Sequence, residues 1–187
     1  MRLFVAVTIP SATRHAIRDA VAPLEALGMP LQWVAEENLH VTLRFLGAVP
    51  DKDTGPIGDA LAAAVRGARP FDVTMGGVGG FPDLALPRAV WIGVERLPAL
   101  ELLANDVAVA LSGFGFEPEL RPFHPHVTIA RSRRNAGRRG LAPLDAAARA
   151  VDYSGLLAVE GVDVMASRIG RGGSQYRSLK HCPLEGG

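Results

Sequence analysis

The sequence has a single cysteine, few aromatic residues and almost no net charge. Because Cys182 is the only cysteine among 187 residues, no disulfide can form within the chain, and a reducing, cytoplasmic setting is expected. The formal net charge is only +1, so any affinity for phosphates must come from a local arrangement of residues. No apolar run approaches membrane-spanning length, and residues 1–7 lack the architecture of a signal peptide. We therefore expect no association with a membrane.

The composition favours a folded domain with a substantial core. Hydrophobic residues make up 48% of the chain and charged residues 21%, which argues against a disordered protein. The length suits one domain, residues 1–187, that can include two closely packed lobes. No Gly-x-Gly-x-x-Gly pattern follows Val7, which argues against a dinucleotide-binding fold.

The order of predicted elements repeats between the two halves of the chain. Each half has a strand, a helix and then a strand that opens with His-x-Thr. These mixed elements predict an α+β fold with two pseudo-symmetric lobes of mainly antiparallel sheet and outer helices around a central cleft. In the first half the three elements are 3–9, 11–27 and 40–46; in the second they are 89–94, 98–111 and 126–130. The other expectations are a helix at 53–66, a strand at 71–78, a loop at 76–87, an irregular basic segment at 132–149, and strands at 156–166 and 175–180.

Two short motifs carry the chemistry, His40-Val41-Thr42-Leu43 and His126-Val127-Thr128-Ile129. With five histidines and six threonines in the chain, two such matches arise by chance in about one shuffled sequence in a hundred. Side chains at i and i+2 of a strand point the same way, so each strand presents an imidazole beside a hydroxyl while its alternate residues are buried.

Two His–Thr pairs facing one cleft suit the cleavage of a cyclic phosphodiester. One imidazole can take a proton from the attacking water while the other gives a proton to the departing ribose oxygen, since the pKa of histidine lies near neutrality. The threonine hydroxyls and backbone amides can bind the non-bridging oxygens as charge develops. The histidine of a single His-x-Thr would more often be a polar residue at the start of a strand with its hydrogen bonds formed and no catalytic role. Two such motifs in matching positions favour the catalytic interpretation.

The chain resembles the two-histidine phosphoesterase superfamily, in particular the bacterial and archaeal RNA 2′,3′-cyclic phosphodiesterases, once called 2′-5′ RNA ligases. Two segments carry the resemblance, 33–47 around His40 and 121–131, whose Arg-Pro-Phe-His-Pro-His leads into the second motif. Supporting stretches are 2–7, 79–82, 87–93 and 176–179, so the similarity extends over nearly the whole chain in order.

The resemblance implies hydrolysis of RNA or nucleotide 2′,3′-cyclic phosphate ends to 2′-phosphomonoesters, with a 2′-5′ ligase side activity. It implies His40 and His126 as the catalytic pair, with His126 as general base and His40 as general acid, and Thr42 and Thr128 as phosphate ligands. No metal, cofactor or obligate protein partner is expected. Arg131 matches a phosphate-neutralising arginine of the family, although strict alternation from His126 places it on the wrong face unless the strand contains a bulge.

Several alternatives stay open. Phe45 and Phe123 could stack on a base or form cleft walls or core, and the same ambiguity applies to Trp33 and Tyr176. A metal pair at His124 and His126 is conceivable, but no Asp, Glu or Cys lies within two residues of either motif to complete it. The arginines between 131 and 139 could guide an RNA strand or form a solvated loop. Alternative functions are a related phosphodiesterase for a small nucleotide cyclic phosphate and an RNA-binding module without turnover.

Overall fold

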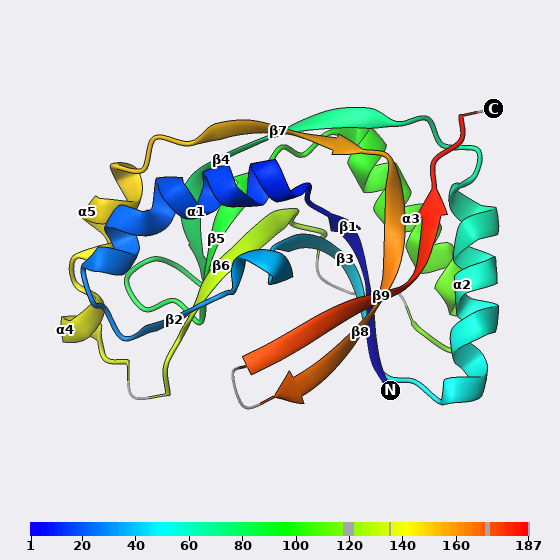
Figure 1. Ribbon diagram of the computed structural model, residues 1–187, viewed down its shortest axis with the longest axis horizontal. Helices are drawn as coiled ribbons and strands as arrows, with labels where there is room; N and C mark the ends of the chain where they lie inside the picture. The colour runs from blue at the N-terminus through cyan, green and yellow to red at the C-terminus, as the bar shows by residue number, and fades with distance from the viewer. Residues whose placement is uncertain (118–121, 135, 171–172, 187) are drawn as a thin grey trace.

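A computed structural model describes residues 1–117, 122–134, 136–170 and 173–186 (Figure 1). Nine antiparallel strands form a curled sheet in the order β7-β4-β5-β6-β3-β1-β8-β9, and β2 pairs with β6. The strands are β1 (Arg2–Thr8), β2 (Leu31–Trp33), β3 (His40–Ala48), β4 (Phe71–Phe81), β5 (Ala89–Val94), β6 (His126–Ser132), β7 (Ser154–Val159), β8 (Gly161–Gly170) and β9 (Gly173–Pro183). The helices are α1 (Ser11–Ala26), η1 (Glu36–Asn38), α2 (Asp51–Val65), α3 (Pro98–Ser112), α4 (Arg138–Leu141) and α5 (Leu144–Arg149).

The sheet confirms the expected pseudo-symmetric α+β architecture. On one side of the centre the order is β3-β1-β8-β9, and on the other it is β6-β5-β4-β7, so β3 corresponds to β6 and β1 to β5. Each His-x-Thr strand is therefore the innermost strand of its lobe. The two lobes join at a single registered pair, Val41 with Val127.

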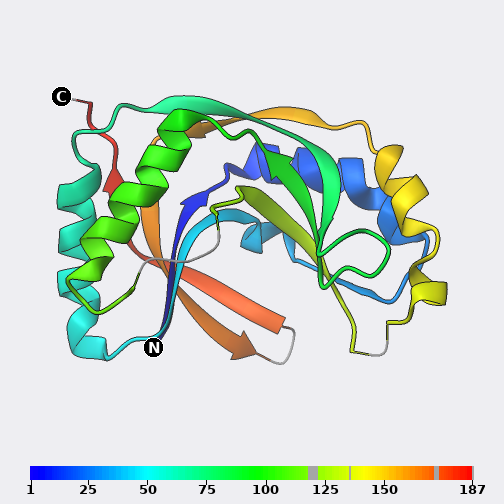
Figure 2. The ribbon, with the colours of Figure 1, turned by 180° about the vertical axis from the view of Figure 1, so that it is seen from behind.

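The helices that follow β1 and β5 cross to the opposite lobe. After β1, α1 packs against α5 and β7, which belong to the lobe of β6. After β5, α3 packs against α2 and β3, in the lobe of β3 (Figures 1 and 2). The strand, helix and His-x-Thr strand of each half therefore do not form one lobe, although they are consecutive in the sequence.

Amphipathic helices explain why one face of the sheet is covered. In α3 the buried residues Leu100, Leu103, Val107 and Leu111 follow helical spacing, and they join the main hydrophobic core. In β1 alternate residues divide between the two faces: Val5 faces that core, whereas Phe4 belongs to a small cluster on the other face. No helix within the described residues is long and apolar enough to span a bilayer.

The predicted loop at 76–87 is wrong over its first half, because β4 continues to Phe81. Here Gly79 lies opposite Trp91 on β5, and a methyl group on Gly79 would lie 2.1 Å from the indole ring. Glycine is therefore required where the tryptophan covers the neighbouring strand. Residues 76–81, expected to belong to this loop, are part of the sheet.

Other boundaries also differ from the predictions. The three-residue strand β2 was not expected, the segment 132–149 contains α4 and α5, and the strand expected at 156–166 is divided between β7 and β8. These are short elements whose position depends on tertiary pairing, such as Leu31 with Ser132.

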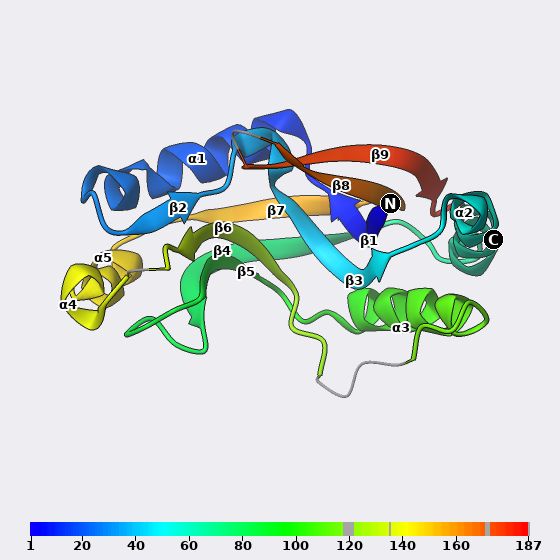
Figure 3. The ribbon, with the colours of Figure 1, turned by 90° about the horizontal axis from the view of Figure 1, so that it is seen from below.

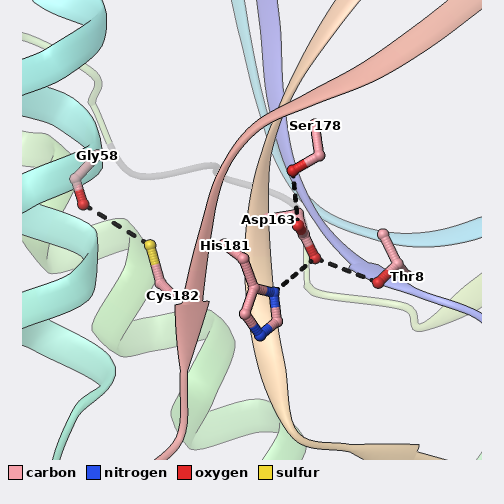
Figure 4. A network of polar contacts seen from close by, with 6 residues as sticks. All are labelled: Thr8, Gly58, Asp163, Ser178, His181 and Cys182. Carbon is pink, nitrogen blue, oxygen red and sulfur yellow. Dashed lines mark hydrogen bonds and ion pairs between the residues drawn. The ribbon is translucent and has the colours of Figure 1, made fainter.

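A buried carboxylate joins three strands in the lobe of β3 (Figure 4). Asp163 on β8 is only 4% exposed and accepts hydrogen bonds from Thr8 on β1 at 3.2 Å and Ser178 on β9 at 2.7 Å. Its other contact is Nδ1 of His181, at 3.2 Å. These three partners satisfy a group that would be costly to bury alone, and they hold β1, β8 and β9 together beside β3, the strand of the first His-x-Thr motif.

Gly79→Ala should lower the free energy of unfolding by about 1–3 kcal/mol, since the added methyl overlaps the rigid Trp91 ring. Gly113→Ala is the matched control: Gly113 follows α3 with helical backbone angles, an added methyl meets no atom within 4 Å, and the change should raise stability by about 0.5–1 kcal/mol. Urea denaturation of both variants measures the two effects. Equal stability of Gly79→Ala and the wild type would contradict the close packing of Gly79 and Trp91.

Candidate active site

One cavity lies where β3 and β6 meet. It has a volume of about 570 Å³, and its walls come from both lobes. Because Val41 and Val127 pair antiparallel and point into the core, His40 and Thr42 share the opposite face with His126 and Thr128. The two predicted His–Thr pairs are thus brought to one cavity. The residues around it are Arg2, Leu3, Phe4, Val34, Asn38, His40, Thr42, Phe45, Gly47, Phe81, Ala89, His126, Thr128, Arg131, Ser167, Ser174 and Tyr176.

A bulge in β6 brings Arg131 to the cavity. Trp91 pairs with Thr128, but the residue before it in β5, Val90, pairs with Ala130, so β6 contains one extra residue at Ile129. The extra residue reverses the alternation, and Arg131 returns to the face of His126. The bulge that the sequence required for this arginine is present.

The same irregularity occurs in β3 and turns Phe45 toward the cavity. Ala6 pairs with Thr42, while Val5 pairs with Arg44, so Leu43 is the extra residue. Phe45 and Arg131 therefore occupy equivalent positions, each five residues after its histidine. Phe45 is 62% exposed and lines the cavity. Two nearly symmetric strands thus place an aromatic ring on one side of the cavity and a guanidinium on the other.

Phe123 does not share this position. It packs, partly buried, against the main core, and it is not among the residues that line the cavity. Its predicted role in substrate binding is therefore without support from its place in the fold. Trp33 likewise packs against the core, under the guanidinium of Arg18 at 5.9 Å. Tyr176 is in the cavity wall, whereas Arg121 lies outside the described residues.

Backbone carbonyls fix the orientation of both imidazoles. Nδ1 of His40 lies 2.7 Å from the carbonyl oxygen of Asn38, and Nδ1 of His126 lies 2.7 Å from that of His124. A carbonyl only accepts, so each Nδ1 carries a hydrogen and each neutral ring has its lone pair on Nε2. For His40 this Nε2 accepts the hydroxyl of Thr42 at 3.0 Å. Both rings are prepared to exchange a proton through Nε2.

Aromatic rings surround each histidine. The His40 ring lies 4.8 Å from Phe4 and 5.2 Å from Tyr176, while the His126 ring lies 5.0 Å from Phe81. The pKa of His40 is lowered from 6.5 to about 4, chiefly because burial disfavours its charged form, and the positive Arg131 and His126 add to this effect. Burial also lowers the pKa of His126, helped by His124 and Arg131. The bonds to the backbone carbonyls oppose both shifts only in part.

Asn38 was not predicted as part of the site, yet it makes two contacts there. Its carbonyl orients His40, and its side-chain Nδ2 donates to the carbonyl of Ser174 on β9 at 2.7 Å. The second bond ties η1 to the part of β9 that also holds Tyr176. Phe4, Phe81, Arg2 and Ser174 were also not expected in the cavity. These residues lie in predicted strands or next to them. The sequence around each residue does not show which strands lie beside β3 and β6, so their place in the cavity could not be predicted.

The alternative metal pair is not supported by the surroundings of His124. Its exposed ring stacks edge-on against Phe81 and Trp91, at 5.2 Å from each, and lies 6.3 Å from the ring of His126. Within the ranges that the structure describes, no three His, Cys, Asp or Glu side chains gather into a metal-binding group.

The chain belongs to the 2′-5′ RNA ligase superfamily, whose family model matches residues 9–168. An RNA 2′,3′-cyclic phosphodiesterase of Thermotoga maritima is 31% identical over 188 residues, covering 100% of this chain and 97% of the relative. One of Geobacillus stearothermophilus is 39% identical over 129 residues, which are 68% of this chain but only 41% of that relative. The crystal structure of Escherichia coli LigT complexed with 3′-AMP superposes with a TM-score of 0.75 at 30% identity, covering 98% of this chain and 97% of that chain.

The low pKa of His40 should be visible by NMR and in the pH dependence of stability. The His40 ring protons should titrate with a midpoint near pH 4. An unfolded histidine takes up its proton near pH 6.5, so between about pH 6.5 and 4 the unfolded state binds more protons and stability falls as the pH is lowered. This contribution is at most about 3 kcal/mol.

Urea denaturation of wild type and His40→Gln at pH 4.5 and pH 7 isolates the effect. The variant should lose less stability than the wild type between the two pH values. A His40 midpoint at the ordinary value, with identical losses in both proteins, would contradict the burial of the imidazole.

Proposed function

We propose that this protein hydrolyses the 2′,3′-cyclic phosphate end of RNA to a 2′-phosphomonoester. The observation that carries the proposal is the convergence of two His–Thr pairs, from two lobes, on one cavity with an arginine beside them. Membership of the superfamily and the names of relatives such as the Thermotoga maritima phosphodiesterase support the same activity. Residues 1–187 act as one catalytic unit, since neither lobe alone supplies both histidines. The single cysteine is consistent with work in the reducing cytoplasm.

In the proposed reaction a water molecule attacks phosphorus opposite the O3′ leaving group. Nε2 of His126 takes a proton from that water, the bond between phosphorus and O3′ breaks, and protonated His40 donates its proton to O3′. The products are a free 3′-hydroxyl and a 2′-phosphate. One histidine ends the turnover protonated and the other neutral, so a single proton transfer through solvent restores the starting state. If the 5′-hydroxyl of a second RNA replaces water as the nucleophile, the same groups form a 2′-5′ phosphodiester while the bond between phosphorus and O3′ breaks, which accounts for a ligase side activity.

The other cavity residues neutralise and orient the substrate. Arg131 can pair with the non-bridging oxygens, and the hydroxyls of Thr42 and Thr128 can donate hydrogen bonds to them as charge builds up. The exposed ring of Phe45 offers a surface for a base. These groups need no metal ion to perform their roles.

Turnover of a short RNA with a 2′,3′-cyclic phosphate end, in the presence of EDTA, tests the mechanism. The wild type should produce the 2′-phosphate, identified by phosphorus NMR. His40→Ala and His126→Ala should each lower kcat by about 10²–10⁴-fold, the usual contribution of a general acid or base. Activity that EDTA abolishes, or a folded wild type without turnover, would overturn the mechanism and favour a metal site or an RNA-binding module.

Asn38→Ala should lower kcat/KM by about fivefold, the value of one hydrogen bond, mainly through KM. The backbone carbonyl that orients His40 is retained, so the pH profile should keep its shape while the wall containing Tyr176 loosens. Glu37→Ala is the control on the same turn, because the Glu37 side chain is exposed and forms no polar contact within the described residues. An altered pH profile in Asn38→Ala would show instead that the side chain acts on His40 itself.

A further inference from the structure

Five exposed arginines form a strip beyond the end of β6, next to the cavity. The strip consists of Arg88, Arg133, Arg134, Arg138 and Arg139. Arg131, at the cavity wall, leads into it along the chain. The net charge of the protein is only +1, so this concentration is local and not a consequence of a basic composition.

Backbone contacts bring the strip together from three segments. The carbonyl of Arg88 accepts a hydrogen bond from the Ser132 amide at 3.2 Å, and the Arg133 amide donates to the carbonyl of Pro30 at 3.0 Å. The same proline lies against Gly140 of α4, since a methyl there would be 3.2 Å from its ring. The end of β6 and α4 therefore lie on one side of the molecule (Figure 3). Asn135, between them, is outside the described residues.

No carboxylate among the described residues pairs with the strip. Within residues 1–117, 122–134, 136–170 and 173–186, none of its five side chains makes an ion pair or a hydrogen bond. Glu25 shares a shallow pocket with Arg133, but it is already paired with Arg18. Asp83, in the loop before Arg88, binds the amides of Ala85 and Leu86. Five unpaired like charges repel one another unless an anion lies over them.

The strip is continuous with the catalytic cavity. Arg131 is on the cavity wall, and the residue that pairs with it, Ala89, is also there and directly follows Arg88. Phe81, another wall residue, accepts the Arg88 amide through its carbonyl. A polymer whose end occupies the cavity can leave it over this edge and meet the strip at once.

We propose that the strip binds the sugar–phosphate backbone of the RNA strand that precedes the terminal cyclic phosphate. The proposal rests on the proposed function, because it assumes that the cyclic end occupies the cavity. Guanidinium groups pair with phosphate oxygens irrespective of the base, so the strip raises the affinity for longer RNA strands whatever their base sequence. It makes an RNA strand a better substrate than a single nucleotide with the same cyclic end. A cavity of about 570 Å³ holds the terminal nucleotide and leaves the rest of the strand outside.

The test compares two substrates with the same terminal nucleoside: a nucleoside 2′,3′-cyclic phosphate and a single-stranded RNA of about ten nucleotides with that cyclic end. In Arg133→Gln/Arg134→Gln, KM for the RNA should rise about tenfold while kcat and the mononucleotide constants stay within about twofold. The slope of log KM against log salt concentration for the RNA should fall by about 0.7 for each phosphate contact removed. Arg138→Gln/Arg139→Gln should shift the same quantities in the same direction.

Lys52→Gln/Arg69→Gln is the matched control, since it removes two exposed charges near α2, on the other lobe. It should leave both substrates unchanged, which separates a local contact from net charge. If the wild type turns over the mononucleotide and the RNA with equal KM and equal salt dependence, the strip proposal is wrong and the proposed function stands. If it turns over neither, the proposed function itself fails. An equal effect of the strip variants and the control on RNA would also overturn the proposal.

Discussion

The arrangement of the site depends on the single point at which β3 and β6 pair. Val41 and Val127 meet there and are both buried, so the face opposite them must carry the residues on either side, His40 with Thr42 and His126 with Thr128. Because the strands run antiparallel and separate after this pair, the two lobes diverge and leave a cavity between them. Loss of this register would move the histidines to the core face, since a shift of one residue reverses every side chain of a strand.

The faces of the two His–Thr pairs could be predicted because alternation within a strand is a local property. The His-x-Thr motifs required only a strand, and β3 and β6 are strands. The side chains that flank them could not be assigned in the same way. Phe4 meets His40 because β1 lies beside β3, and Phe81 meets His126 because β4 and β5 lie beside β6, which is a matter of strand order. The extension of β4 through its glycines was missed for the same reason, since the need for glycine at position 79 comes from Trp91 on another strand.

The crossing of α1 and α3 to the opposite lobes explains how the two halves of a repeated sequence layout pack onto each other. Periodicity identified both helices, but an amphipathic face does not say which sheet it covers. Since α1 packs on the lobe of β6 and α3 on that of β3, each lobe is completed by a helix from the other half of the chain. Neither half can then bury its apolar surface alone, and the distance between the two histidines is set by the packing of the whole chain.

The bulges and the low pKa of His40 together show how a symmetric frame supports an asymmetric reaction. Equivalent bulges deliver Phe45 to one side and Arg131 to the other, so the frame itself does not decide which histidine gives and which takes a proton. Burial and the neighbouring positive charge lower the pKa of His40 to about 4 and so keep the ring neutral at physiological pH, which suits a base and not an acid. A phosphate anion beside Arg131 would reverse the sign of the local field and favour the protonated imidazole. The general acid would then form only when substrate is bound, so that one buried ring serves the acid role without remaining charged in an apolar wall.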